Sequence, residues 1–190
     1  MMLDPLDRIE QYLRVADSAW STSRKDAVLA TPDQVVQAVR TVGTVIAEQY
    51  FLGTAKHESN WATNERDMEP ADHRGLRFTS WGLYQLSDEE AKTVGRPRAK
   101  LLDLQESTWI LAKLAEIRRV AIRGALKLEA MAPDPDGMEA YLAIAHNLGL
   151  SSCITSLRKH GLDWPGYKSR NPTLRIVSSG YGEDCLPRRL

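Results

Sequence analysis

The sequence of 190 residues has little cysteine, no excess of charge of either sign and no long apolar run. Its 25 basic residues equal its 25 acidic residues, so no global field would attract nucleic acid or an anionic lipid surface. The most apolar stretch, Tyr50 to Ala55, ends at Lys56, well short of the roughly 18 apolar residues that a membrane span needs. We therefore expect neither nucleic acid binding nor a membrane span.

The scarcity of cysteine also excludes a zinc framework, which needs paired ligands at short spacing. Cys153 and Cys185 are far apart in the sequence. We expect them to be unpaired thiols, with a disulfide that pins the C-terminal tail as the alternative. His57 beside Glu58 is half of a zinc-protease motif, but Trp61 stands where the second histidine would be, so that motif fails. We predict no metal site.

The N-terminus lacks the basic start and the apolar run of a secretory signal. It reads MMLDPLDRIEQYLRVAD, with acidic residues at Asp4 and Asp7. We therefore expect synthesis in the cytoplasm without a cleaved signal peptide.

What the sequence does contain is typical of one globular domain rich in helices. Hydrophobic residues make up 43% and charged residues 26%, which are ordinary values for a folded chain, and this length suits one buried core. Capping-box patterns begin at Thr31 and Ser87, and Asp103 with Glu106 marks a third helix start. We predict helices from Thr31 toward Lys56, from Ser87 to Gly95, from Asp103 to about Met131, from Met138 to Leu148 and from Ser151 to Gly161, after an amphipathic helix near Leu6 to Ala19.

One segment, Asn60 to Trp81, departs from the helical pattern. It is polar, charged and irregular, which favours a functional loop or a disordered one, and a short two- or three-stranded element could lie there. The predicted fold class is therefore mainly α with at most a small β element in this loop. We divide the chain into an N-terminal helical extension (residues 1–30), a central domain (31–177) and a C-terminal tail (178–190) that looks loosely structured.

Three short motifs stand out, and each begins or ends a predicted helix: KHESNW (Lys56–Trp61), SWGLYQLS (Ser80–Ser87) and YLAIAHNLG (Tyr141–Gly149). The first places Glu58 near the C-terminal end of an apolar helix, where a carboxylate is poorly solvated and is repelled by the negative helix end. Both effects favour the protonated carboxyl that a general acid needs near neutral pH. Taken alone, the motif also fits an exposed glutamate at a helix end.

In order and content these motifs resemble the lysozyme-like domain shared by soluble lytic transglycosylases and goose-type lysozymes. That family has Glu-Ser after an apolar helix, then a Gly-Leu-Met-Gln-like turn and an Ala-Tyr-Asn-x-Gly-like helix end. The resemblance covers about Val45 to Gly149 and implies a lysozyme-like fold for residues 31–177. The corresponding residues here are Glu58-Ser59, Gly82-Leu83-Tyr84-Gln85 and Ala145-His146-Asn147-Leu148-Gly149.

The resemblance implies an enzyme that cleaves the β-1,4 bond between N-acetylmuramic acid and N-acetylglucosamine in peptidoglycan, with no metal and no organic cofactor. Glu58 would be the general acid that protonates the glycosidic oxygen as the bond breaks through an oxocarbenium-like state. Gly82, Gln85 and Asn147 would line the sugar cleft, and Ser59 would bind the substrate. For Ser59 and Asn147 a structural role at a helix end is the alternative.

Two positions depart from the family pattern. Tyr84 stands where the family usually has Met, and His146 stands where it usually has Tyr. We count both among the candidate substrate-binding residues, with a structural histidine whose ring nitrogens are satisfied as the alternative for His146. Trp61 and Trp81 flank the motifs, and they would either stack on sugar faces or serve in packing.

A second carboxylate decides between two reactions. An inverting hydrolase needs a carboxylate that activates water, whereas a lytic transglycosylase lets the C6 hydroxyl of its substrate attack and forms a 1,6-anhydro sugar. The loop offers Glu65, Asp67, Glu69 and Asp72; Asp72 is the best candidate, but no clean motif singles it out. We favour the transglycosylase, and an inverting goose-type-like muramidase that uses a loop aspartate is the alternative.

Peptidoglycan lies outside the cytoplasm, so an enzyme without a signal peptide needs another route to it. A phage virion that carries the enzyme, or a holin that releases it, would supply one. The partners we expect are peptidoglycan glycan strands and phage tail or virion components, on which the segments up to about Ala30 and after Gly161 would dock. A noncatalytic glycan-binding or phage assembly module with the same fold is the rival interpretation.

Overall fold

The computed structural model describes residues 27–64, 66–71, 75–129, 131–135, 137–160, 182 and 184–186. Over these ranges the chain is mainly helical and contains one two-stranded antiparallel sheet, so the predicted mainly α class with a small β element is confirmed. The helix predicted near Leu6 to Ala19 lies outside the described residues. The elements occur in this order: helices α2 (Pro32–Val42) and α3 (Glu48–Ser59), strands β1 (Arg66–Ala71) and β2 (Gly75–Trp81), helix α4 (Asp88–Thr93), the 3-10 helix η1 (Arg98–Leu102), and helices α5 (Leu104–Ala125), α6 (Met138–Leu148) and α7 (Leu150–His160).

The first two helices are separate, although the apolar spacing predicts one helix from Thr31 toward Lys56. Thr31 caps α2 as predicted: its hydroxyl accepts from the Gln34 N–H, and the Gln34 side chain accepts from the Thr31 N–H. Gly43 then ends α2 with a left-handed φ of 68°, which glycine adopts without a Cβ clash. The prediction of one continuous helix is therefore wrong, because apolar periodicity does not show that Gly43 turns the chain.

Side-chain caps start α4 and α5 where the sequence predicts them. Ser87 and Glu90 form the capping box of α4. The Asp103 carboxylate accepts from the Glu106 N–H at the start of α5. Local side-chain chemistry therefore determines both helix starts.

The bounds of the last three helices agree with the prediction for α6 and differ from it for α5 and α7. Helix α5 ends at Ala125, short of the predicted Met131, because a turn with Lys127 at φ 54° follows it. Helix α6 has the predicted bounds. Helix α7 begins at Leu150, so Ser151 is a helical residue and not its cap, and the predicted end of this helix at Gly161 lies outside the described residues.

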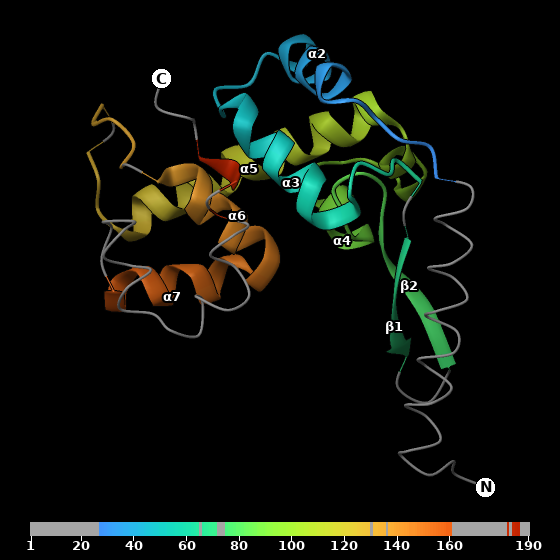
Figure 1. Cartoon of the computed structure of the whole chain (residues 1–190). Coiled ribbons are helices and arrows are strands. Elements are labelled where there is room, and N and C mark those ends of the chain that lie inside the picture. The colour runs from blue at the N-terminus through green and yellow to red at the C-terminus, as the bar shows by residue number, and fades with distance from the viewer. Residues whose placement is uncertain are drawn as a thin grey trace, which may run out of the picture.

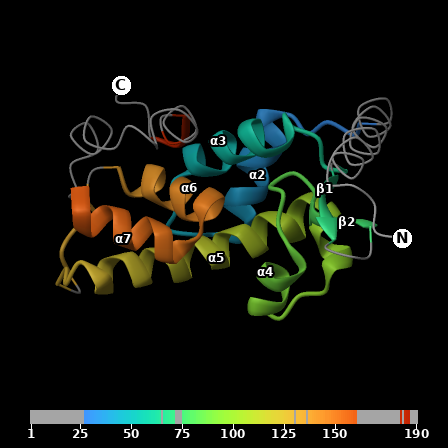
Figure 2. The same cartoon turned by 90° about the horizontal axis from the view of Figure 1, so that it is seen from below.

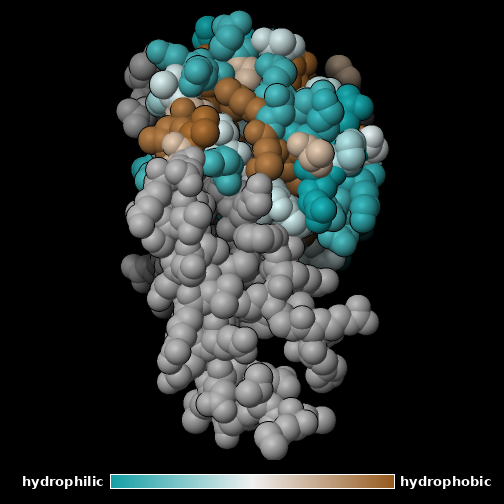
Figure 3. Space-filling view, turned by 90° about the vertical axis from the view of Figure 1, so that its right-hand side faces the viewer, coloured by the Kyte–Doolittle hydropathy of each residue, from teal (hydrophilic) through white to brown (hydrophobic). Residues whose placement is uncertain are grey.

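Helix α5 is the centre of the fold. It contacts α2, α4, η1, α6 and α7 and runs along the length of the helical body (Figure 2). Helix α3 packs against α2 and α6, and the β1–β2 hairpin projects from one end of the body (Figure 1). On the side of the hairpin, hydrophilic residues cover most of the described surface (Figure 3). Among the described helices, none combines enough length with enough apolar character to cross a bilayer.

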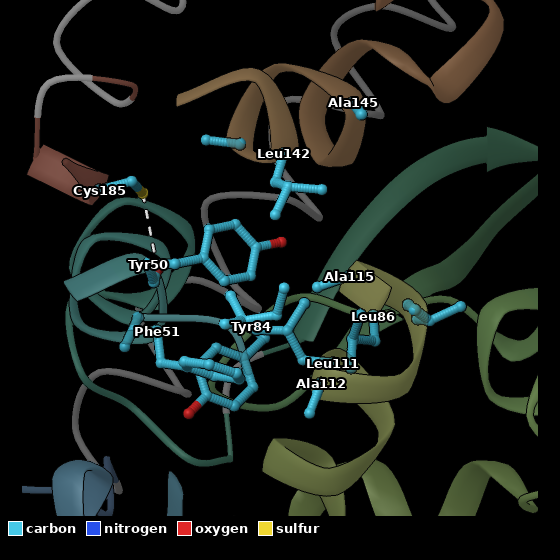
Figure 4. Packing of buried hydrophobic residues seen from close by; sticks show 14 of the residues in the cluster. Tyr50, Phe51, Tyr84, Leu86, Leu111, Ala112, Ala115, Leu142, Ala145 and Cys185 are labelled. Atoms are coloured by element: carbon cyan, nitrogen blue, oxygen red, sulfur yellow. Dashed lines mark hydrogen bonds between the residues drawn. The ribbon is translucent and has the colours of Figure 1, made fainter. Parts of the chain in front are cut away.

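The core lies where α3, α5, α6 and the turn after β2 meet (Figure 4). The ring centroids of Tyr50 and Phe51 are 5.4 Å apart and those of Phe51 and Tyr84 are 6.3 Å apart, both in edge-on geometry. All three side chains are fully buried, and Leu111 of α5 and Leu142 of α6 pack around them. Because α3, the turn after β2 and α6 carry the three motifs, the packing of this core determines where the motifs meet.

Two segments that the sequence places outside the domain pack against its core. The Ala30 N–H donates to the Trp61 carbonyl at 2.9 Å, and Ala30 is buried. At the other end of the chain, Cys185 is fully buried, and its thiol donates to the Tyr50 carbonyl at 3.5 Å. The tail is therefore not loosely structured at residues 184–186. Cys185 and Cys153 are both free thiols, which confirms the prediction that they are unpaired.

Candidate functional site

Glu58 lies in the last turn of α3. Its side chain is 18% exposed, and its Oε1 lies 3.7 Å from Nε2 of His146. Among the residues that the structure describes, no donor hydrogen-bonds to this carboxyl. Glu58 is therefore neither fully solvated nor held by a hydrogen bond from any residue that the structure describes.

Ser59 connects the end of α3 to the turn of the second motif. Its hydroxyl lies 2.8 Å from the Leu83 carbonyl oxygen and 3.2 Å from that of Ala55, and the residue is 7% exposed. The structure therefore uses Ser59 to join two motifs, which is the structural role that the sequence leaves as the alternative to substrate binding.

The second motif forms a loop, residues 82–85, that Trp81 and Leu86 close by exchanging backbone hydrogen bonds of 3.0 and 3.1 Å. Gly82 has a φ of 77°, and a Cβ at this position would lie 1.9 Å from the Leu101 carbonyl oxygen. The sequence assigns this glycine to the sugar cleft. The structure gives a different reason for it, because the end of η1 approaches the backbone too closely for any side chain.

Tyr84 and Gln85 have different surroundings. Tyr84 is fully buried, burial raises the pKa of its hydroxyl, and that hydroxyl hydrogen-bonds with Thr108 at 3.0 Å. The predicted substrate contact of the Tyr84 side chain is therefore wrong, because the ring fills the core. Gln85 is partly buried; its Nε2 donates to the Gly82 carbonyl at 2.8 Å. Its Oε1 is a buried acceptor to which no described residue donates a hydrogen bond.

Strained backbone conformations gather around the first two motifs. Four described non-glycine residues have a left-handed φ: Asn60 (49°), Trp61 (74°), Gln85 (47°) and Lys127 (54°). Three of the four either follow Glu58-Ser59 directly or end the 82–85 loop. Such a conformation costs about 1 kcal/mol or more, and it is enriched at functional sites. The strain is a second feature that points to this region.

The third motif contributes His146 from the last turn of α6. Its side chain is 4% exposed, its Nε2 lies 2.9 Å from the Tyr84 carbonyl oxygen, and its Nδ1 lies 3.2 Å from Nη1 of Arg118. The three motifs therefore meet at Glu58. Because both ring nitrogens contact protein atoms, His146 has no free nitrogen for the substrate hydroxyl that the sequence suggests.

Of the remaining predicted residues, those that the structure describes have other surroundings. Asn147 is exposed at the end of α6. Trp81 is 9% exposed and lies under the Arg98 guanidinium, whose carbon is 5.1 Å from the ring centroid, so it serves in packing. Trp61 is partly buried against the core. Asp72, the predicted second carboxylate, lies outside the described residues.

Arg118 and Glu90 are absent from the sequence prediction, yet they complete the cluster. The Arg118 Nη2 lies 2.5 Å from the Glu90 Oε1. Burial of the Glu90 carboxyl opposes its ionisation. The anion is stabilised by the charge of His146 when that ring is protonated, by the Ser87 N–H and by the Arg118 guanidinium, so the pKa of Glu90 lies below its ordinary value. An arginine between Leu114 and Ile122 on the apolar face of α5 is the signal that could have found this pair.

The described cluster suits proton transfer at a single carboxyl. In the described part of the chain, no three His, Cys, Asp or Glu side chains gather as metal ligands would. Comparisons of the chain with protein-family models, with curated proteins and with solved structures gave no match. Any assignment of function therefore rests on the motifs and on the geometry of the residues that carry them.

Proposed function

We propose that this chain degrades peptidoglycan as a lytic transglycosylase, with Glu58 as the general acid and base. The observation that carries the proposal is the convergence of the three motifs: Glu58 lies 3.7 Å from His146, which hydrogen-bonds to the Tyr84 carbonyl. A partly buried carboxyl at the meeting point of distant motifs is the arrangement expected of an active site. The resemblance of the motifs supplies the substrate, a glycan strand with β-1,4 bonds.

In the proposed reaction, protonated Glu58 gives its proton to the glycosidic oxygen, and the bond from this oxygen to C1 of N-acetylmuramic acid breaks through an oxocarbenium-like state. The C6 hydroxyl of the same sugar attacks C1 and passes its proton to the Glu58 carboxylate, which restores the acid. The product carries a 1,6-anhydro ring, and no water is consumed. One carboxyl serves both steps, which agrees with a site where the neighbouring Glu90 is already bound by Arg118.

Gln85 is the residue that we assign to substrate binding. Its buried Oε1 accepts no hydrogen bond from a described residue, and an unsatisfied buried acceptor is costly. A sugar hydroxyl or an acetamido N–H would satisfy it. The left-handed backbone of Gln85 fixes the position from which this oxygen is presented.

Clearing of purified peptidoglycan by the purified protein tests the proposal. We expect Glu58→Gln to lower the clearing rate by about 100-fold or more, as loss of a general acid does. Glu89→Gln is the matched control, because Glu89 is exposed on α4, and it should clear like the wild-type protein. Circular dichroism verifies that both variants are folded. Equal clearing by the Glu58→Gln variant would refute the assignment.

Mass spectra of the released muropeptides test the type of reaction. A transglycosylase leaves anhydro ends, which are lighter by one water than the reducing ends that a hydrolase leaves. Exclusively reducing ends would refute the transglycosylase and favour a muramidase with a second carboxylate, for which Asp72→Asn is the next variant.

A further inference from the structure

A line of polar side chains from three helices lies behind Glu58. Arg118 of α5 contacts Glu90 of α4 through Nη2 and His146 of α6 through Nη1. The side chains of Arg118, Glu90 and His146 are 11%, 24% and 4% exposed. Burial of charges is costly even when they are paired, so the place of this pair next to a candidate catalytic carboxyl requires a physical reason.

The contacts determine where the proton of His146 lies. A guanidinium only donates hydrogen bonds, so Nδ1, which faces Arg118 at 3.2 Å, accepts and carries no proton. A carbonyl oxygen only accepts, so Nε2, which is 2.9 Å from the Tyr84 oxygen, carries the proton. These hydrogen bonds therefore select the tautomer with its proton on Nε2. This nitrogen lies 3.7 Å from Oε1 of Glu58, and Nδ1 lies 3.8 Å from Oε1 of Glu90.

Glu90 orients Arg118 while it also caps a helix. Its Oε2 accepts from the N–H of Ser87 at 2.8 Å and from the Ser87 hydroxyl at 3.0 Å. Its Oε1 accepts from Arg118. The capping box of α4 therefore fixes the carboxylate that holds the guanidinium against His146.

The other titratable groups around this line are uncharged near neutral pH. Tyr50 of α3 has a buried hydroxyl, and burial raises its pKa although the charge of Arg118 opposes this. Burial likewise raises the pKa of Cys153 on α7 to about 12, again against the effect of Arg118. The charges that face the imidazole are therefore the Arg118 guanidinium, the Glu90 carboxylate and, when it is ionised, Glu58.

We infer that Arg118 and Glu90 are positioning residues of the proposed active site, where they keep His146 in the tautomer whose N–H lies beside Glu58. The inference rests on the proposed function, because the tautomer acts through Glu58. With its proton on Nε2, the ring presents an N–H dipole to the Glu58 carboxylate that proton transfer produces, across a distance of 3.7 Å. With its proton on Nδ1, the ring would present a lone pair to that carboxylate instead.

Nitrogen-15 NMR of the histidine rings in the whole chain measures the tautomer directly. The chain has four histidines, and the signals of His146 are identified by their loss in His146→Gln. We expect the proton of the ring to lie on Nε2 and not on Nδ1 at about pH 8, above the range in which histidines ordinarily change charge. A proton on Nδ1 at this pH overturns the inference, whatever the activity of the protein.

A double variant, Glu90→Gln with Arg118→Met, removes the donor that faces Nδ1 without leaving a buried charge unpaired. We expect His146 of this variant to populate the tautomer with its proton on Nδ1. The clearing rate at the same pH should then fall by about 10-fold, a loss typical of supporting residues. Glu89→Gln is the matched control and should keep the wild-type tautomer and clearing rate.

Circular dichroism shows whether the double variant is folded. A folded double variant with the wild-type tautomer, or with the wild-type clearing rate, overturns the positioning role. If it does not fold, Glu90→Gln alone should show the same change to a smaller extent, and an unaltered tautomer there overturns the role as well. Failure of the proposed function has a different signature, because Glu58→Gln would then clear like the wild-type protein.

Discussion

Single residues in the 82–85 loop adopt backbone conformations that few residue types tolerate. Gly82 has a φ of 77°, and Gln85 has a φ of 47°. At Gly82 the constraint is space, because the Leu101 carbonyl occupies the position of a Cβ. At Gln85 the side chain donates to the Gly82 carbonyl, which offsets part of the cost of its left-handed backbone. The two residues therefore stabilise the loop by different means.

Replacement of Gly82 by alanine tests the close approach of η1. We expect Gly82→Ala to lower the free energy of unfolding by about 3 kcal/mol or more, because steric overlap adds to the strain of a left-handed alanine. Gly43→Ala is the matched control: Gly43 has a similar φ of 68° but no atom within 4 Å of the added Cβ, so only about 1 kcal/mol should be lost. Urea unfolding measures both, and similar losses would contradict the steric explanation.

At the scale of single residues, the sequence predicts which segments come together more reliably than it predicts the contacts of each side chain. The motifs identify Glu58, the 82–85 loop and His146 as one group, and the structure brings these together. They do not show that the Tyr84 side chain points into the core while its carbonyl faces His146. Order along the chain indicates neighbouring segments, whereas the direction of a side chain depends on packing against Phe51 and Thr108, which the motif does not contain.

At the scale of helices, local chemistry was predictable and contacts between helices were not. Thr31, Ser87 and Asp103 cap the helices that the sequence predicts for them, because a cap needs only residues within one turn. The bond from Arg118 to Glu90 joins α5 to α4, and no periodicity in either helix indicates its partner. The prediction from sequence is therefore reliable at these capped helix starts and weaker for the ends of helices and for the site that several elements build.

Glu90 makes the link between α4 and α5 dependent on pH. Its pKa is lowered in the folded protein from the ordinary value of 4.5, so its stabilising contribution is complete above that value. The contribution is lost as the pH falls through 4.5 toward the folded pKa, because the unfolded chain then binds the proton more tightly. We expect the free energy of unfolding of the wild-type protein to fall in this acidic window, and urea unfolding at a series of pH values measures it.

The matched pair Glu90→Gln and Glu89→Gln separates this effect from general acid denaturation. At neutral pH, Glu90→Gln should lose about 2 kcal/mol, the size of a hydrogen bond to a charged group, and its stability should fall less steeply below pH 4.5 than that of the wild-type protein. Glu89→Gln should follow the wild-type curve. If both variants have the same slope as the wild-type protein, Glu90 does not contribute to the acid sensitivity.

At the scale of the whole molecule, a short segment far along the sequence packs against the helix that carries Glu58. Residues 184–186 pack on α3, where Asp184 accepts from Lys56 at 2.7 Å and contacts Nε2 of His57 at 2.6 Å. The Lys56 hydrogen bond lowers the pKa of the Asp184 carboxyl, and His57 adds to this effect although burial opposes it. Gly53 makes the contact possible, because a Cβ there would lie 2.5 Å from Sγ of Cys185.

Gly53→Ala should therefore displace the C-terminal segment from α3, even though alanine favours a helix over glycine by about 1 kcal/mol. The measurement is the rate at which the two thiols react with dithiodipyridine. In the wild-type protein both are buried and should react slowly; in Gly53→Ala we expect Cys185 to react at least about 10-fold faster, because local opening now exposes it, while Cys153 stays slow. Gly124→Ala, in α5 with no atom within 4 Å of the added Cβ, should change neither rate. Equal reactivity of Cys185 in all three proteins would mean that the packing of residues 184–186 on α3 does not depend on the absence of a side chain at Gly53.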